Sequence, residues 1–145
     1  MIRRRRDPTD LPWAEGYPLE GDSRACASYV SHLPIRGGRH ASDRFGYYQI
    51  VEDSSVVGGI GFHSAPLDGV VEIGYGVVPG SRGRGVATEA LRMAIGIAGA
   101  AGARTVCGRT GEDNVASQRV MLAAGMTLVG RDTDFLHFER QLLVP

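Results

Sequence analysis

The spacing of hydrophobic residues changes several times along the chain, and each change marks a new element. Three segments rich in β-branched and aromatic residues occupy residues 44–52, 56–64 and 70–78, separated only by the short turns DSS and APLDG. Short links of this kind favour antiparallel pairing of successive strands. The pattern therefore predicts a three-stranded antiparallel meander in the middle of the chain.

From residue 87 onward the hydrophobic period becomes helical, with apolar residues at steps of three and four up to Gly102. A second helix is predicted over 114–125, with Asn114 as its N-cap and Gly125 just past its end. A third helix is predicted over 20–33, where Asp22 and Ser23 are N-cap candidates. Further strands are predicted at 103–110, 126–132 and 135–143.

The order of these elements is helix, three strands, helix, strand, helix, two strands. With 145 residues, this order predicts a single α/β (α+β) domain spanning residues 1–145, built on a central mixed sheet. The first 20 residues read as irregular. Their basic run, Arg3 to Arg6, is interpreted as a solvated terminal segment or an edge strand.

The charge of the chain removes several functional classes. Its formal net charge is zero, so no global field attracts nucleic acid. All sixteen basic residues are Arg, which excludes Schiff-base chemistry and a phosphate loop that depends on lysine. Cys26 and Cys107 fit neither a zinc site nor a disulfide framework, and no apolar run is long enough to span a membrane. We expect a cytoplasmic protein with no metal and with no nucleic-acid or membrane partner.

The segment SRGRGVAT, residues 81–88, places Gly and Arg between a predicted strand and a predicted helix. The first amides of a helix lack internal partners and attract anions, and Gly83 and Gly85 let an anion approach the backbone closely. Arg82 and Arg84 add charge-assisted donors. The segment is interpreted as a pyrophosphate cradle, with an exposed flexible turn as the alternative. A dinucleotide loop fits poorly because the run from Gly83 ends in Thr88 where glycine or alanine is required.

Two motifs carry a family resemblance. The stretch GVVPGSRGRGVATEAL resembles the acyl-CoA signature of the GNAT superfamily of N-acetyltransferases, with Arg82, Gly85 and Ala87 in its fixed places. The stretch NVASQRVMLAAGM is similar to the family's second element, which is filled here by Asn114, Ser117, Gly125 and Met126. The match is strongest to the branch that includes the ribosomal-protein N-terminal acetylases.

This resemblance implies a mixed, mostly antiparallel sheet with helices on both faces and a splayed strand pair at the cofactor site. It implies acetyl-CoA as cosubstrate, with its pyrophosphate on the amides of residues 83–88 and its pantetheine arm along residues 75–77. It also makes a homodimer a reasonable expectation. The implied cofactor-binding residues are Tyr75, Gly76, Val77, Arg82, Gly83, Arg84, Gly85, Val86, Ala87, Thr88, Asn114 and Ser117.

Glu72 is the candidate general base, because it lies on the strand that leads to the cofactor loop and can act through a water. The alternative is an ordinary strand carboxylate that faces solvent or pairs with an Arg. Many relatives carry a Tyr acid at the position of Met121, so Ser117 is the nearest hydroxyl that can replace it, with hydrogen bonding at the helix start as its alternative role. His63 is a weaker candidate for the acceptor pocket, and His137 is expected to be packed or at the rim.

These observations predict an N-acetyltransferase that moves an acetyl group from acetyl-CoA to a primary amine, by direct attack of the amine. The acceptor is a small molecule or a protein N-terminus, and the sequence does not distinguish them. The alternative is a non-catalytic acyl-CoA-binding or regulatory module, and a nucleotide-dependent oxidoreductase is a third, weaker hypothesis.

Overall fold

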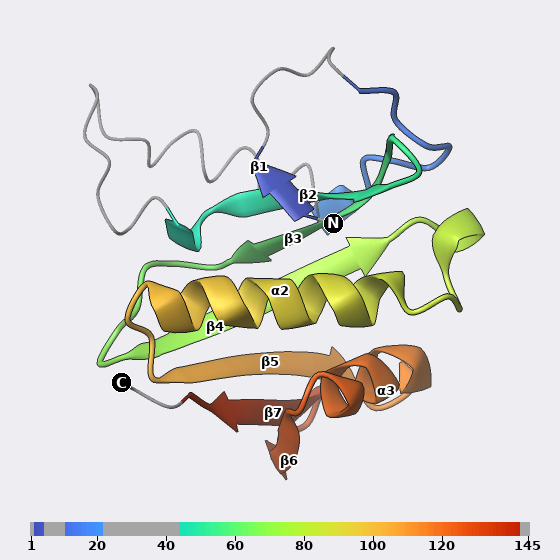
Figure 1. Ribbon diagram of the computed structural model, residues 1–145. Helices are drawn as coiled ribbons and strands as arrows, with labels where there is room; N and C mark the ends of the chain where they lie inside the picture. The colour runs from blue at the N-terminus through green and yellow to red at the C-terminus, as the bar shows by residue number, and fades with distance from the viewer. Residues whose placement is uncertain (1, 5–10, 22–43, 143–145) are drawn as a thin grey trace.

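The computed structural model of the chain describes residues 2–4, 11–21 and 44–142 (Figure 1). The helix predicted over 20–33 falls almost entirely outside these residues, together with its cap candidates Asp22 and Ser23. Two helices are described, α2 (Val86–Ala100) and α3 (Val115–Ala123), along with a short 3₁₀ turn η2 (Pro79–Ser81).

Seven strands form one sheet in the order β1-β2-β3-β4-β5-β7-β6. All neighbouring pairs are antiparallel except β4 and β5, which are parallel. The predicted meander is confirmed as β2–β3–β4, and the mixed, mostly antiparallel sheet is confirmed as the fold class. The strands are β1 (Ile2–Arg4), β2 (Tyr47–Glu52), β3 (Ser55–Phe62), β4 (Val70–Val77), β5 (Thr105–Gly111), β6 (Thr127–Arg131) and β7 (Phe135–Gln141).

The N-terminal segment corrects the expectation that the first 20 residues are wholly irregular. Residues 2–4 form an edge strand in which Arg3 pairs with Gln49 of β2, in backbone register and through a 2.9 Å hydrogen bond from Arg3 Nη2 to Gln49 Oε1. Of the two readings of the arginine run, the edge strand therefore holds for Arg3 and Arg4, while Arg5 and Arg6 lie outside the described residues.

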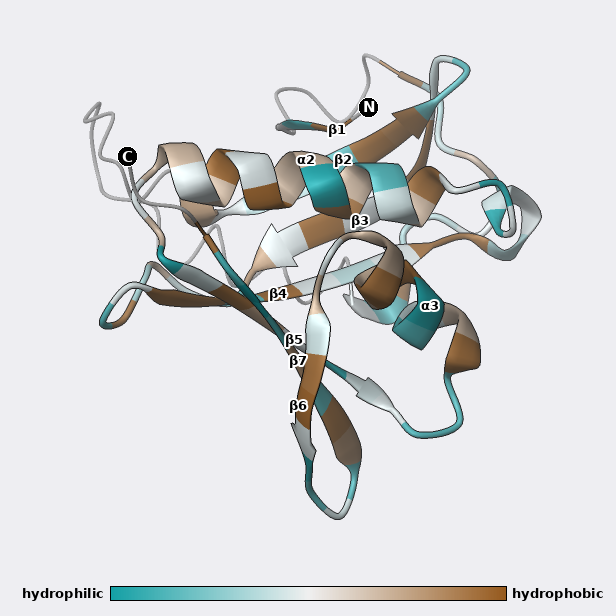
Figure 2. Ribbon diagram, turned by 60° about the horizontal axis from the view of Figure 1, so that its bottom comes forward, coloured by the Kyte–Doolittle hydropathy of each residue, from teal (hydrophilic) through white to brown (hydrophobic). Residues whose placement is uncertain are grey.

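The core lies between the sheet and α2. The buried face of α2 presents Ala90, Leu91, Ala94, Ile95 and Ala98, which is the apolar stripe that the helical period predicts. Helices α2 and α3 contact each other, and Figure 1 draws both in front of the sheet. Brown and teal segments alternate along α2 in Figure 2, as expected for a helix with one buried face.

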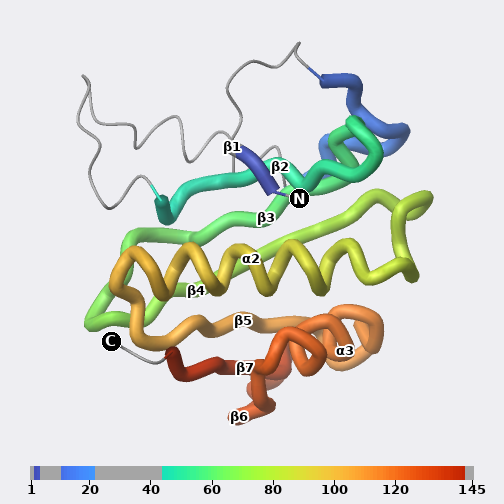
Figure 3. The backbone as a smooth tube through the Cα atoms, viewed as in Figure 1, coloured from blue at the N-terminus to red at the C-terminus, as the bar shows by residue number. Residues whose placement is uncertain are grey.

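Strands β4 and β5 pair over only three positions, Val70↔Thr105, Val71↔Val106 and Glu72↔Cys107. Beyond Glu72 the two strands separate. Figure 3 shows them side by side at the left and diverging toward the right, where the loop before α2 and helix α3 are located. The expected splayed strand pair is therefore present, and its open end lies beside the N-terminus of α2.

The close contact of β3 with β4 depends on glycine. A Cβ at Gly58 would lie 2.2 Å from the carbonyl oxygen of Gly76, well inside van der Waals contact. The backbone of Gly58 has an ordinary negative φ, so the requirement for glycine here is steric and not conformational.

We predict that Gly58→Ala destabilises the fold, because its methyl group must force β3 and β4 apart. The expected loss is about 1–3 kcal/mol, as for other overpacked sites. Gly96→Ala is the matched control, since Gly96 is exposed on α2 with no atom near its added Cβ. The control should gain about 0.5–1 kcal/mol from helix propensity. Chemical denaturation of both variants measures this, and equal stability of Gly58→Ala and the parent would contradict it.

Candidate functional site

The loop between β4 and α2 is shaped by two glycines. Gly83 and Gly85 have φ angles of +81° and +79°, in the left-handed region that favours glycine, and Gly85 is the N-cap of α2. A Cβ at either position would meet no atom within 4 Å, so the space in front of the loop is open. The loop therefore turns sharply and leaves its backbone accessible.

The N-terminus of α2 presents unpaired amides to this open space. The first bond of the helical ladder is donated by the Glu89 amide to the Gly85 carbonyl, at 3.0 Å, and no side chain caps the helix. The amides of Val86, Ala87 and Thr88 consequently have no partner within the helix. Together with the helix dipole, these donors form an anion-binding arrangement.

Two arginines of the loop have defined partners. Arg82 Nε donates to the Val77 carbonyl oxygen at 2.8 Å, which ties the loop back to the end of β4. Arg84 forms an ion pair with Glu52, at the end of β2. Both side chains thus hold the loop in place, and Arg84 is partly neutralised by a carboxylate.

The outer edge of β4 is free of strand pairing beyond Glu72. The His63 amide donates to the Glu72 carbonyl and the Val78 amide donates to the Val57 carbonyl, so even-numbered residues of β4 turn their backbone groups toward β3. By this alternation, Tyr75 and Val77 direct their N–H and C=O groups toward the gap left by β5. The carbonyl of Val77 is the one that Arg82 occupies. Gly76, in contrast, faces β3, and a Cβ there would lie 2.9 Å from Leu19 Cδ1.

A pair of hydroxyl groups connects β4 to α3 across the splay. Tyr75 Oη lies 2.9 Å from Ser117 Oγ and 3.2 Å from the Ser117 carbonyl oxygen. Asn114 is the N-cap of α3 as predicted, because its Oδ1 accepts from the Ser117 amide at 3.1 Å. Burial raises the pKa of the Tyr75 phenol, and the hydrogen bond to Ser117 offsets part of that effect. The phenol is therefore neutral, and able to donate a proton, at physiological pH.

Met121, at the position where the resemblance leads one to expect a Tyr acid, is fully buried. Its methyl group packs against β5, where a Cβ at Gly108 would lie 3.0 Å from Met121 Cε. This residue is thus part of the core. The hydroxyl that contacts α3 at this place is that of Tyr75, which comes from β4.

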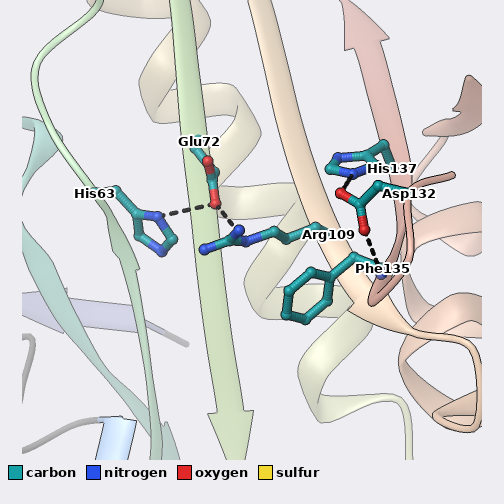
Figure 4. A network of polar contacts seen from close by, with 6 residues as sticks. All are labelled: His63, Glu72, Arg109, Asp132, Phe135 and His137. Carbon is teal, nitrogen blue, oxygen red and sulfur yellow. Dashed lines mark hydrogen bonds and ion pairs between the residues drawn. The ribbon is translucent and has the colours of Figure 1, made fainter. Parts of the chain in front are cut away.

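Glu72 lies at the point where β4 and β5 separate, on the face away from Tyr75, and it is the centre of an ion-pair cluster (Figure 4). Its Oε1 is 3.0 Å from His63 Nδ1 and 3.2 Å from Arg109 Nε. Arg109 comes from β5, and its guanidinium also lies 4.7 Å from the centre of the Phe135 ring. The carboxylate is therefore paired with an Arg, as the alternative interpretation of Glu72 stated, and with a His as well.

Cys107 is the partner of Glu72 in the last β4–β5 pair. Burial raises the pKa of its thiol, and the negative charges of Glu72 and Glu139 raise it further. The thiol is accordingly a poor nucleophile at neutral pH.

Within the described residues, no group of three or more His, Cys, Asp or Glu side chains is arranged to hold a metal ion.

The sequence-predicted residues fall into two groups on opposite faces of β4. The loop residues 82–88, Tyr75 and the α3 pair Asn114 and Ser117 surround the open end of the splay, whereas Glu72 is on the other face with His63 and Arg109. Sequence reasoning did not single out Arg109 or the Tyr75 hydroxyl. The alternation of side chains along β4 was the signal that could have separated these two groups, because residues 72 and 75 of a strand point to opposite faces of the sheet.

A family model described as "Acetyltransferase (GNAT) domain" matches residues 4–127. No curated protein matches the chain. Among the residues that the structure describes, no helix has the length and apolar character needed to cross a membrane.

Several solved structures share the fold. An acetyltransferase of the GNAT family from Bacillus anthracis aligns with a TM-score of 0.61 at 20% identity, over 66% of this chain and 65% of that chain. N-acetyltransferase PseH from Campylobacter jejuni, in complex with acetyl coenzyme A, aligns with 0.58 at 19% identity, over 66% of each chain. RimL, a ribosomal L7/L12 alpha-N-protein acetyltransferase in complex with coenzyme A, aligns with 0.61 at 21%, over 67% and 62%. For these three proteins the alignment spans slightly less than two thirds of the neighbour's chain.

The contact between Asp132 and His137, beside the Glu72 cluster in Figure 4, gives a prediction that NMR can test. The pKa of Asp132 is lowered to about 2, first by its hydrogen bond with His137, at 2.6 Å, and then by the amides of Asp134 and Phe135. Because the folded value lies below the usual 3.8, this contact stabilises the fold above about pH 4, and the effect disappears as pH falls through 2. His137→Ala should therefore raise the Asp132 pKa, measured by carbon-13 titration of the carboxyl. An unchanged midpoint would contradict the assignment.

Proposed function

Because the chain belongs to the GNAT family of acetyltransferases, we propose that it transfers an acetyl group from acetyl-CoA to a primary amine. The observation that carries this proposal is the juxtaposition of two unpaired backbone surfaces, the N-terminal amides of α2 and the free edge of β4. One suits a pyrophosphate and the other suits the amide-containing pantetheine arm of the same cofactor. The acceptor is the amine of a small molecule or of a protein N-terminus.

Acetyl-CoA would bind with its pyrophosphate against the amides from Gly83 to Thr88. Its pantetheine arm would lie along Tyr75 and Val77, where its amides would pair with the β4 backbone groups that β5 does not reach. Arg82 would keep this edge in shape through its bond to Val77, and Arg84 would exchange Glu52 for a phosphate oxygen. The thioester would then lie between β4 and β5, close to the point where they separate.

Direct attack of the amine on the thioester forms a tetrahedral oxyanion, which needs a donor. A free amide of β4, at Tyr75 or Val77, is suitably placed to supply it. The departing thiolate can take a proton from the Tyr75 hydroxyl, which Ser117 positions at 2.9 Å. Ser117 thus contributes as the partner of Tyr75, in place of the direct acid role first considered for it.

A non-catalytic acyl-CoA-binding module is the second candidate, and the buried Met121 favours it because the family's usual acid position carries no hydroxyl. The two candidates share cofactor binding and differ in turnover. An acceptor screen with mass detection separates them, using acetyl-CoA with polyamines, amino acids, aminoglycosides and N-terminal peptides. Acetylated product supports the enzyme, and binding without any product supports the module. A cytoplasmic location and a homodimer stay predictions.

We predict that Gly85→Val weakens coenzyme A binding at least tenfold, because a branched side chain enters the open space in front of the α2 amides. Gly102→Val is the matched control, since Gly102 also has a positive φ, +97°, with open space around it, but lies at the other end of α2. Both variants should lose stability through backbone strain. Only Gly85→Val should lose affinity, as measured by calorimetry on the folded proteins. Equal affinities in the two variants would return the loop to a flexible turn.

We predict that Tyr75→Phe lowers kcat by about one to two orders of magnitude, at or below the low end of the usual ~10²–10⁴-fold contribution of a general acid. The KM for acetyl-CoA should change little, because the ring and the backbone of residue 75 are kept. The loss of kcat should be smallest for acceptors whose amine attacks the thioester slowly. For these, departure of the thiolate is not limiting, because a thiol with a pKa near ~8.5 leaves tolerably without a proton donor. A kcat equal to that of the parent would remove the acid role of Tyr75.

A further inference from the structure

His63 occupies a distinctive place at the end of β3. Its Nδ1 contacts Glu72 Oε1 at 3.0 Å, and its other ring nitrogen, Nε2, lies over β4 at Gly74. A Cβ at residue 74 would be 3.0 Å from Nε2, so glycine at this position allows the imidazole to lie against the strand. Figure 4 shows the ring beside β4, with Nδ1 directed at Glu72.

Glu72 is poorly placed to take a proton from a substrate through Oε1. This oxygen is buried and accepts no hydrogen bond of good geometry, so its contacts are the two ion pairs, with a nitrogen of His63 and a nitrogen of Arg109. Arg109 is itself fixed, since its guanidinium lies over the ring of Phe135. The carboxylate is thus held on one side by the guanidinium and on the other by the imidazole.

A carboxylate at Nδ1 decides which nitrogen of a histidine carries the proton. The negative charge of a carboxylate beside Nδ1 favours a proton on that nitrogen, and Nε2 then keeps its lone pair and becomes the basic site. This is the arrangement in which a base is oriented by a third group. The side chain of His63 is about half exposed, so an acceptor molecule has access to the ring.

We propose that His63 is the general base of the acetyl transfer and that Glu72 is a positioning residue that holds its tautomer. This assignment rests on the proposed function. It replaces the role of base first considered for Glu72 with an indirect one. Nε2 lies over Gly74, on the face of β4 opposite the Tyr75 side chain and near the point where β4 and β5 separate, where the thioester is proposed to lie.

The proposed step is balanced as follows. The acceptor ammonium gives one proton to Nε2, and the lone pair released on nitrogen attacks the thioester carbonyl carbon, forming the C–N bond. When the C–S bond breaks, its electron pair leaves with sulfur. The sulfur is protonated from the Tyr75 hydroxyl, which is restored by the second proton of the amine nitrogen. The proton on Nε2 returns to solvent, so the products are the amide, the coenzyme A thiol and one proton.

The charged groups that face His63 among the described residues come from two strands. Glu72 of β4 contacts the ring directly, and Arg109 of β5 lies beyond that carboxylate. Cys107 of β5 interacts with the charge of Glu72 from the side of the last strand pair. The loss of activity in acid therefore reflects His63 together with Glu72 and Arg109, and not an isolated imidazole ring.

The kinetic test compares His63→Gln with His137→Gln, a matched control that removes the other described histidine paired with a carboxylate. With acetyl-CoA and an amine acetylated by the parent, kcat/KM of His63→Gln should fall by about 10²–10⁴ at pH 7, the usual contribution of a general base. The parent should lose activity in acid, because a protonated Nε2 cannot accept a proton, and His63→Gln should lack this loss. His137→Gln should behave like the parent, and acetyl-CoA affinity should be equal in all three.

Glu72→Gln tests the positioning role through a readout that does not need turnover. Long-range proton–nitrogen NMR distinguishes a protonated ring nitrogen from a bare one. The neutral His63 ring of the parent should be protonated at Nδ1 and bare at Nε2. Glu72→Gln should show a mixture of tautomers, with a smaller loss of kcat/KM than His63→Gln. A bare Nδ1 in the parent would overturn the assignment.

Two kinetic outcomes separate the base from the function on which it rests. Transfer that persists undiminished in His63→Gln, with its loss of activity in acid intact, removes the base and leaves the acetyltransferase standing. A parent that transfers acetyl to no amine removes the proposed function, and the role of His63 is overturned with it.

Discussion

The end of pairing between β4 and β5 is the constraint on which the rest of the site depends. After Glu72↔Cys107 the two strands share no further pairs, so the backbone groups of Tyr75 and Val77 lack a neighbouring strand. Glu72 and Arg109 then form an ion pair across the start of the gap, while Tyr75 and Ser117 connect its two sides further on. The gap is therefore bounded by the Glu72–Arg109 ion pair at its start, on one face of β4, and by the Tyr75–Ser117 contact further along, on the other face.

The loop after β4 is built by the same logic. Arg82 returns to the last free carbonyl of the strand, and Gly85 turns the chain so that α2 begins with its amides directed into open space. A helix packed so firmly on the sheet, through Leu91 and Ile95, cannot move its N-terminus easily. Strand edge and helix terminus are therefore held in a fixed relation before any ligand arrives, which lowers the cost of ordering on binding.

The elements with a clear period were predictable from sequence, namely the meander, α2 and α3, and so was the N-cap at Asn114. The sharp turn before α2 was predictable because Gly83 and Gly85 can adopt the left-handed backbone that the turn requires, while its use as an anion site stays a prediction. The cluster around Glu72 was not, since His63, Glu72 and Arg109 are on three separate strands and meet only through register. The short strand β1 was only one of two interpretations of the arginine run, because three residues carry no measurable alternation. Tyr75 was assigned to cofactor binding, but the reach of its hydroxyl to Ser117 depends on the packing of α3.

The cations of the cofactor loop are guanidinium groups, Arg82 and Arg84, and the sequence contains no lysine. A guanidinium stays protonated and has no amine nitrogen that attacks a thioester at physiological pH. A bound acyl donor would therefore be surrounded by positive charge that carries no amine nucleophile. Because the sequence contains no lysine, no lysine amine of the chain can compete with the acceptor for the acetyl group.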